Sequence, residues 1–301
     1  MTNRGSKAVA LEKRDPVTGR MTTGHEWNGI EELETPIPRV VIFFLVVTIL
    51  FSIGYWIFMP AWPLGWTYTK GLLGIDQRTT VEQQVEQAKA ERAVWMDQIE
   101  QMDFATIQAD SALMGVVQEA GATLFGDNCA VCHGTRGTGG KGFPDLAAKA
   151  WLWGGDPEAI AETIRVGINS PHEETRTSQM LAFGRDGMLD RTQIDDVLAY
   201  VQSIGTASEQ AQPTPEAAAR GSEIFAENCA SCHGEDAKGM HDLGAPDLTD
   251  ASWIYGGDLQ TLHTTVYSGR QGHMPAWEGR LSAADRKILT LYVLALPQEK
   301  Q

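Results

Sequence analysis

Residues 129–134 read Cys129-Ala130-Val131-Cys132-His133-Gly134, and residues 229–234 read Cys229-Ala230-Ser231-Cys232-His233-Gly234. The two copies contain all four cysteines of the 301-residue chain. The spacing Cys-X-X-Cys-His is typical of covalent haem attachment, in which both thiols form thioethers to one porphyrin and the histidine ligates the iron. A redox-active cysteine pair or half of a zinc site would not require the histidine and would not explain the repeat. The sequence therefore predicts two covalently bound c-type haems and one-electron transfer chemistry.

The sequence around each motif repeats as well. Gly121 and Phe125 precede the first motif at the distances at which Gly221 and Phe225 precede the second. After each motif come Pro-Asp-Leu, an aromatic segment with Gly-Gly-Asp, a helical stretch that ends in glycine, and a last amphipathic helix. The last helices are expected at 189–204 with Tyr200 and at 281–296 with Tyr292. This pattern resembles class I cytochrome c, so each module is expected to pack its own first helix against the aromatic residue of its own last helix.

The predicted fold is all-α, with one N-terminal transmembrane helix followed by two tandem class I cytochrome c domains. A segment at 205–217 with Pro, Ser, Thr and Gln is interpreted as the linker between the domains. Residues 81–108 are interpreted as a polar helix, either a solvated spacer or a docking surface for another subunit. The expected boundaries are 1–39 for a cytoplasmic tail, 40–60 for the transmembrane helix, 61–111 for an interfacial connector and spacer helix, 112–206 for the first cytochrome c domain and 207–301 for the second.

The sixth iron ligand of each haem is expected to be a methionine, which gives a low-spin electron carrier. In the second module, Met274 is followed by Pro275, and this Met-Pro resembles the distal loop of class I cytochromes, where proline stiffens the backbone that presents the sulfur. Met180 aligns with Met274 through a nearby alanine and aromatic residue, although Leu181 replaces the proline. In the second module the competing candidate is His273, whereas Met240 lies too near the attachment site to serve. In the first module the competing candidates are Met188 and His172.

Residues 40–59 form an uncharged apolar run that is long enough to span a membrane as one helix. The competing interpretation is a cleaved signal peptide, but the run is too long for one and follows an unusually long segment. Basic residues before the run outnumber those just after it, which favours a cytoplasmic N-terminus. Haem attachment to this motif takes place outside the bacterial cytoplasm. We therefore expect a single-pass protein of the bacterial inner membrane with both haem domains in the periplasm.

The chain carries a formal net charge of −15. Residues 1–39 contain equal numbers of acidic and basic side chains and the apolar run contains none, so all of the excess negative charge lies beyond the membrane run. Such a surface would repel nucleic acid. It serves either solubility alone or the steering of a basic electron donor such as a soluble cytochrome c.

The N-terminal tail narrows the choice of protein family. It contains Gly24-His25-Glu26-Trp27-Asn28-Gly29-Ile30, followed by Pro36-Ile37-Pro38-Arg39 and the apolar run. With two haem motifs behind it, this tail resembles that of the di-haem subunit III of cbb3-type cytochrome c oxidase, the CcoP/FixP family. The resemblance covers essentially the whole chain, although some members carry two membrane spans and only one is visible here.

The resemblance implies a role, partners and ligand pairs. The chain would accept electrons from a donor cytochrome c and pass them through a mono-haem cytochrome c subunit to a haem–copper catalytic subunit, which reduces O2 to water and pumps protons. It would be part of an enzyme without a catalytic residue of its own. His133 and Met180 would ligate one iron, and His233 and Met274 the other.

Two other functions fit parts of the pattern. A free-standing, membrane-bound di-haem carrier for another reductase would share the motifs but would not purify with haem–copper and mono-haem subunits. A di-haem peroxidase would need one haem with an open or switchable site. The Met-Pro loop and the close similarity of the two modules disfavour the peroxidase.

Overall fold

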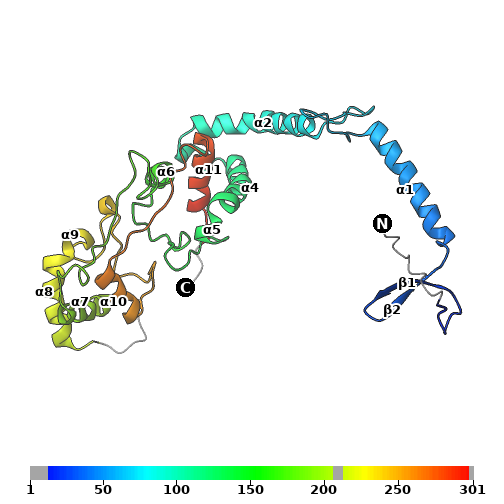
Figure 1. Cartoon of the computed structure of the whole chain (residues 1–301). Coiled ribbons are helices and arrows are strands. Elements are labelled where there is room, and N and C mark those ends of the chain that lie inside the picture. The colour runs from blue at the N-terminus through cyan, green and yellow to red at the C-terminus, as the bar shows by residue number, and fades with distance from the viewer. Residues whose placement is uncertain (1–12, 206–212, 298–301) are drawn as a thin grey trace, which may run out of the picture. The chain divides into compact units, whose positions relative to one another are not determined.

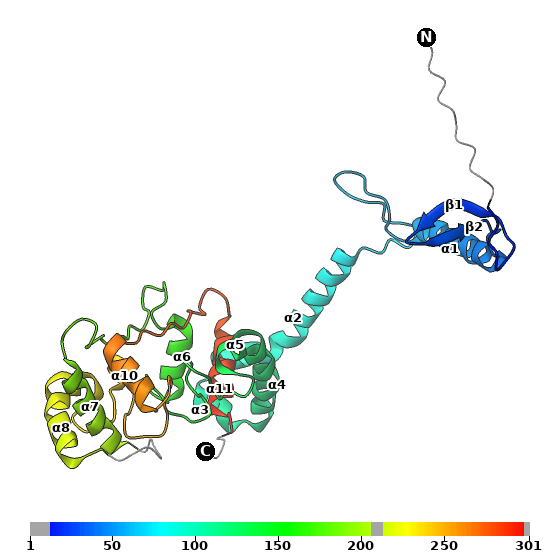
Figure 2. The same cartoon turned by 60° about the horizontal axis from the view of Figure 1, so that its bottom comes forward.

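The computed structural model describes residues 13–205 and 213–297, which form two compact units divided between Lys89 and Ala90. The linker residues 206–212 lie outside the described residues. Helices predominate, as predicted, and the strands in the described part of the chain pair in a single hairpin. Figures 1 and 2 show the elements with the labels used below.

The hairpin consists of β1 (Thr22–Trp27) and β2 (Ile30–Leu33), which pair antiparallel. Asn28 and Gly29 form its turn, with φ of 53° and 83°. Two positive φ values match the twist of the flanking strands, which is why Asn-Gly is favoured in two-residue hairpins. The all-α prediction omits this hairpin, although the Asn-Gly pair within the tail motif was a signal for it.

The helix α1 (Arg39–Phe58) is long and apolar enough to cross a membrane, and it is the one such helix among the described residues. None of its residues is buried within the protein, so its apolar side chains are available to lipid. Behind it, the amides of Leu72 and Leu73 donate to the carbonyl oxygens of Ile57 and Phe58 at 2.9 and 3.1 Å. These bonds satisfy carbonyl groups that the last turn of a helix leaves without partners.

The second unit contains both motif regions. The first repeat comprises α4 (Ser111–Asn128), α5 (Ala130–His133), α6 (Pro157–Val166) and α7 (Arg191–Ile204). The second comprises α8 (Pro215–Asn228), α9 (Ala230–His233), the 3-10 helix η1 (His241–Leu243), α10 (Leu259–Ser268) and α11 (Ala283–Leu294). The last helices begin two residues later than expected, because Asp190 and Ser282 form capping boxes there.

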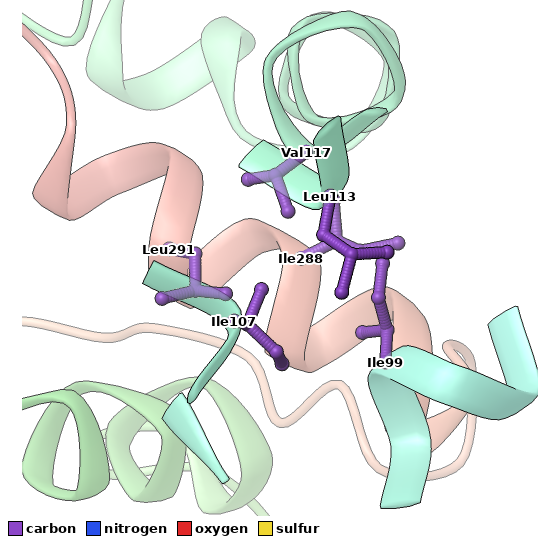
Figure 3. Packing of buried hydrophobic residues seen from close by; sticks show 6 residues of the cluster. All are labelled: Ile99, Ile107, Leu113, Val117, Ile288 and Leu291. Atoms are coloured by element: carbon purple, nitrogen blue, oxygen red, sulfur yellow. The ribbon is translucent and has the colours of Figure 1, made fainter. Parts of the chain in front are cut away.

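Two helices, α2 (Gln77–Gln101) and α3 (Phe104–Ala109), replace the single spacer helix expected over residues 81–108. Asp103 separates them, because its side chain caps α3 by accepting a hydrogen bond from the Thr106 amide at 2.7 Å. Most of α2 is exposed, but Ile99 near its end is fully buried. Figure 3 shows that Ile99 packs with residues of α3, α4 and α11: Ile107, Leu113, Val117, Ile288 and Leu291.

The last helices are exchanged between the two repeats. α11, from the end of the second repeat, packs against α4 and α6 of the first, and α7, from the end of the first, packs against α8 and α10 of the second. Both views show α11 beside α4 and α7 beside α8 (Figures 1 and 2). The expectation that each repeat packs its own first helix against its own last helix is therefore wrong.

The crossing of α4 with α11 depends on Gly121. A Cβ atom at Gly121 would lie 2.7 Å from the Cβ of Tyr292, which is closer than two such atoms can approach. One turn further along α4, the ring of Phe125 lies 5.6 Å from the ring of Tyr292 between centroids. Only glycine allows the two helices to come this close.

The crossing of α7 with α8 repeats the same arrangement. A Cβ atom at Gly221 would lie 2.0 Å from the carbonyl oxygen of Asp196, and the rings of Tyr200 and Phe225 lie 5.2 Å apart. The glycine and aromatic residues that the repeat singles out thus do pack at helix crossings. Each first helix meets the tyrosine of the other repeat.

Two backbone pairings mark where the chain crosses from one set of helices to the other. After α6, Ile168 pairs with Met274 through two hydrogen bonds of 2.9 Å. After α10, Arg270 pairs with Met180 through hydrogen bonds of 3.0 and 2.8 Å. The helices between these two pairings, α7 to α10, therefore form one set. Within it α7, the last helix of the first repeat, comes before α8, the first helix of the second. The other set consists of α4, α5 and α6 before this stretch and α11 after it.

Candidate haem sites

Site A is the region around the first motif, enclosed by α4, α6 and α11, and site B is the region around the second motif, enclosed by α7, α8 and α10. In each site the first cysteine ends a helix, and the next residues form one helical turn, α5 or α9. Residues three apart in such a turn lie on the same face, so the two cysteines of each motif face the same side. Burial raises the pKa of Cys129 and Cys229 to about 11, so these thiols are protonated until they react.

Both motif histidines make the same second hydrogen bond. The Nδ1 atom of His133 lies 3.1 Å from the carbonyl oxygen of Pro144, and that of His233 lies 3.1 Å from the carbonyl oxygen of Pro246. A carbonyl oxygen can only accept, so Nδ1–H donates and Nε2 is left free for a metal. Burial lowers the pKa of both histidines, which favours the neutral ring that binds iron.

Met274 packs at site A and Met180 packs at site B. Met274 belongs to the buried cluster that includes Cys129. Met180 and Trp253 pack against the same buried cluster, and Trp253 also packs against the cluster that Cys229 contacts. The pairing implied by the family resemblance, with Met180 at the first motif and Met274 at the second, is therefore not the arrangement in the structure. The reason is the exchange of last helices, because each methionine precedes a last helix and crosses with it.

The competing side chains have other partners or lie at the surface. The Nε2 atom of His172 lies 2.7 Å from a carboxylate oxygen of Glu278. His273 is exposed, and its Nδ1 lies 2.9 Å from the carbonyl oxygen of Asn169. Met188 is 45% exposed and Met240 is 38% exposed. In the described part of the chain, none of these four belongs to the apolar clusters around the two motifs.

Some buried hydrogen-bond donors have no acceptor, and they show whether the sites suit a haem. The indole N–H groups of Trp153 and Trp253 and the Nε–H of Arg176 are buried and have no hydrogen-bond partner among the described residues. Such groups cost free energy unless something accepts from them. A haem carries two propionate carboxylates, which are strong acceptors, so these donors fit it. A cavity of about 710 Å³ is lined by Trp253 and by Pro144 and Pro246, whose carbonyl groups hold the motif histidines.

Two arginines of these sites are missed by sequence reasoning. The guanidinium carbon of Arg176 lies 5.0 Å from the ring centroid of Trp153, and that of Arg270 lies 4.3 Å from the ring centroid of Tyr255. Trp153 and Tyr255 hold the same position in the repeated aromatic Gly-Gly-Asp segment, which was the available signal. The arginines follow at different distances, so the repeat does not align them.

The two Cys-X-X-Cys-His sites follow one apolar helix that fits a single-pass membrane anchor. This arrangement defines the class of membrane-anchored cytochromes c, and the two domains imply c-type haems. Three parts of the sequence match known families. Residues 19–66 match the N-terminal domain of cytochrome oxidase-cbb3, FixP, residues 118–205 match cytochrome c, and residues 216–293 match cytochrome c oxidase, cbb3-type, subunit III.

Full-length relatives agree with these matches. The chain is 46% identical to the cbb3-type cytochrome c oxidase subunit FixP of Bradyrhizobium sp. (strain ORS 278), over 94% of this chain and 96% of the relative. It is 44% identical to the subunit CcoP of Azospirillum sp. (strain B510), over 95% and 98%, and 45% identical to CcoP of Cereibacter sphaeroides, over 91% and 94%. The chain therefore belongs to the FixP/CcoP family and is the di-haem subunit of a cbb3-type cytochrome c oxidase.

Proposed function

We propose that His133 and Met274 are the axial ligands of one haem iron, at site A, where Cys129 and Cys132 form the thioether bonds. Correspondingly, His233 and Met180 ligate the second iron at site B, where Cys229 and Cys232 hold the porphyrin. The observation that carries this proposal is the packing of each half-buried methionine at the opposite repeat's motif. The pairing of His172 with Glu278 and the exposure of His273, Met188 and Met240 support it.

When bound, each c-type haem supplies a one-electron iron couple, whose potential a methionine ligand raises. The residues of the chain hold and insulate that couple. The Nδ1–H groups of His133 and His233 keep both rings in one orientation by donating to proline carbonyls. Buried side chains such as Phe125 and Leu289 at site A keep water from the iron. Excluding water lowers the energy needed to reorient the surroundings when the iron gains or loses an electron. The buried indole N–H of Trp253 would be available to hold a haem propionate at site B.

Within the oxidase, the chain accepts electrons from a donor cytochrome c and passes them to the mono-haem cytochrome c subunit. From there they reach the haem–copper catalytic subunit, which reduces O2 and pumps protons. Membership of the family supports this route. The excess negative charge beyond the membrane run supports a basic donor, because opposite charges raise the encounter rate.

The tail lies in the bacterial cytoplasm, α1 crosses the inner membrane once, and both haem domains lie in the periplasm. The bias of basic residues toward the segment before α1 supports this orientation. Protease treatment of right-side-out and inside-out vesicles tests it. The haem domains should be cleaved only in the first and the tail only in the second, and the reverse pattern would contradict the orientation.

The ligand pairs are tested in chains that keep one haem. In the full-length Cys129→Ser/Cys132→Ser variant, only site B retains a haem. Adding Met180→His should remove the weak sulfur-to-iron absorption band and lower the potential, whereas adding Met274→His should leave both unchanged. In the Cys229→Ser/Cys232→Ser variant the two methionine substitutions should exchange their effects. Loss of the band on the opposite substitution would show that the pairs follow the repeats.

The partners and the donor have separate tests. Native mass spectrometry of the detergent-solubilised oxidase should give two haems on this chain, together with the mono-haem and haem–copper subunits.

The rate at which a basic soluble cytochrome c reduces the complex should fall as salt is added, because screening weakens steering. A rate that does not depend on salt would count against the acidic docking surface.

A further inference from the structure

Two positions that face each other at each site carry different residues at site A and site B. The first position is the second residue before the glycine that ends α6 or α10, and it holds Arg165 at site A and Tyr267 at site B. The second position is the fourth residue after the methionine, and it holds Glu278 at site A and Gly184 at site B. Because of the exchange, each pair joins one repeat to the other.

At site A the pair is ionic. The Nη1 atom of Arg165 lies 3.2 and 3.4 Å from the two carboxylate oxygens of Glu278, and Nε2 of His172 lies 2.7 Å from one of them. Glu162 and Glu174 hold the other nitrogens of Arg165 at 2.5–2.8 Å. The Arg165 side chain is 26% exposed, so it is partly shielded from solvent.

Glu278 of this ionic pair lies on the loop that carries Met274, and Arg165 lies on α6. The amides of Trp277 and Glu278 donate to the last carbonyl groups of α6, on Ile164 and Arg165, at 3.1–3.2 Å. At the start of the loop, Met274 pairs with Ile168. The Met274 loop is therefore held at its start by Ile168, just after α6, and further along by the end of α6 itself, where the Arg165–Glu278 pair adds a charged contact.

At site B the corresponding contact contains no charge. A Cβ atom at Gly184 would lie 2.2 Å from the ring of Tyr267, so only glycine leaves room for the ring at this position. The amide of Arg185 donates to the carbonyl oxygen of Tyr267 at 2.9 Å. The ring of Tyr267 also stacks on His263, with centroids 5.9 Å apart. The Met180 loop is thus held by packing where the Met274 loop is held by ions.

We propose that Arg165 and Glu278 are positioning residues that hold the Met274 sulfur at the site A iron, so that this iron–sulfur bond, unlike that of site B, depends on an ionic contact. The proposal rests on the assignment of Met274 as the sixth ligand of site A. Weakening the contact releases the methionine from the iron and lets an external ligand bind there. Site B, whose loop is held by the Tyr267–Gly184 packing, is insensitive to the same treatment.

The test uses the full-length Cys229→Ser/Cys232→Ser variant in detergent, which keeps a haem at site A alone. Carbon monoxide is the probe, because it binds the iron only where the methionine has left the sixth coordination position. Arg165→Tyr and Glu278→Gly should each raise the carbon monoxide-reactive fraction about tenfold, which corresponds to about 1.4 kcal/mol, and lower the potential. The double variant recreates the site B pair and should restore the sulfur-to-iron band. Glu174→Gln removes an exposed partner of Arg165 that is not on the Met274 loop and should change neither readout.

Salt gives an independent readout without substitution. The Debye length falls from about 10 Å at 0.1 M to about 3 Å at 1 M ionic strength, so added salt should raise the carbon monoxide-reactive fraction at site A and leave site B unchanged. If Met274→His leaves the band of site A intact, the ligand assignment fails. If it removes the band while Arg165→Tyr and Glu278→Gly leave carbon monoxide binding unchanged, the assignment stands and the positioning role is refuted.

Discussion

Phe125 and Tyr292 pack with their ring centroids 5.6 Å apart, although one precedes the first haem motif and the other lies in α11, the last helix of the second repeat. Tyr200, which the repeat pairs with Phe125, instead lies 5.2 Å from Phe225. Each site therefore needs residues from both repeats. Site A cannot be completed until α11 has been synthesised.

Double-mutant cycles test the exchange directly. Phe125→Leu and Tyr292→Leu should show a coupling energy of about 0.5–1.5 kcal/mol, the range for aromatic pairs in contact. Phe125→Leu and Tyr200→Leu should be additive within about 0.5 kcal/mol, because those side chains do not touch. The measurement is the free energy of unfolding of the full-length chain in denaturant. Coupling of Phe125 to Tyr200 in place of Tyr292 would mean that the repeats are not exchanged.

The parts of the fold that sequence reasoning predicts are those with local signals. The haem motifs, the apolar run and the capped last helices each depend on residues close together in the chain. The exchange has no such signal, because the glycines and aromatic residues that pack at the crossings are the same in both repeats. Either pairing of first and last helices would satisfy Gly121, Gly221, Tyr200 and Tyr292 equally well.

Residues that differ between the repeats distinguish the two pairings. On α7 and α8, Asp196 and Arg220 form a bidentate ion pair at 2.6 and 2.7 Å. The corresponding positions on α11 and α4 hold Ile288 and Ala120, which pack together in an apolar core. Without the exchange, Asp196 would face Ala120 and Arg220 would face Ile288, which would bury a carboxylate without its partner. The charges therefore favour the exchanged arrangement. The repeat does not single out these positions, because their residues differ between its two copies.

The Asp196–Arg220 pair makes the stability of site B depend on pH. Hydrogen bonds from Arg220 lower the pKa of the Asp196 carboxyl in the folded protein below its ordinary value of 3.8. A carboxyl whose folded pKa is lowered stabilises the fold fully above its unfolded pKa and loses that contribution as pH falls through the folded pKa. Asp196→Asn should therefore unfold more easily than the natural chain at pH 7, and the difference should shrink below about pH 4.

The neighbouring residue provides a matched control for this prediction. Asp195 lies on the exposed face of the same helix, so Asp195→Asn changes the charge by the same amount without touching Arg220. Its unfolding midpoint should stay close to that of the natural chain at both pH values. An equal loss of stability in the two variants would assign the effect to helix charge and not to the ion pair.

The turn of the tail hairpin is expected to tolerate substitution poorly. Gly29 has φ of 83°, which side chains adopt at a cost of about 1–2 kcal/mol. Gly29→Val should loosen the pairing of β1 with β2, whereas Ile30→Val keeps a β-branched side chain in a strand and should have little effect. The rate of tryptic cleavage after Arg20, just before β1, reports the difference in the full-length chain. Equal cleavage rates in both variants would show that the turn does not limit hairpin stability.

Lys287 joins the end of α2 to α11 by donating from Nζ to the carbonyl oxygens of Glu100 and Met102 at 2.8 and 2.6 Å. These carbonyl groups lie where α2 ends, and they have no helical amide to accept from. Lys287→Met keeps much of the apolar stem but removes the donor, and should lower the free energy of unfolding by about 1–3 kcal/mol. Hydrogen exchange should quicken in the last turn of α2, around Ile99.

An exposed lysine on α2 serves as the comparison. Lys89 lies on α2 and pairs with Glu86 at 2.8 Å, with 60% of its side chain exposed. Lys89→Met should change the free energy of unfolding by less than about 0.5 kcal/mol, because exposed pairs of this kind contribute little. If Lys287→Met is equally mild and leaves hydrogen exchange at Ile99 unchanged, the contact of α2 with α11 depends on the apolar cluster of Figure 3 alone.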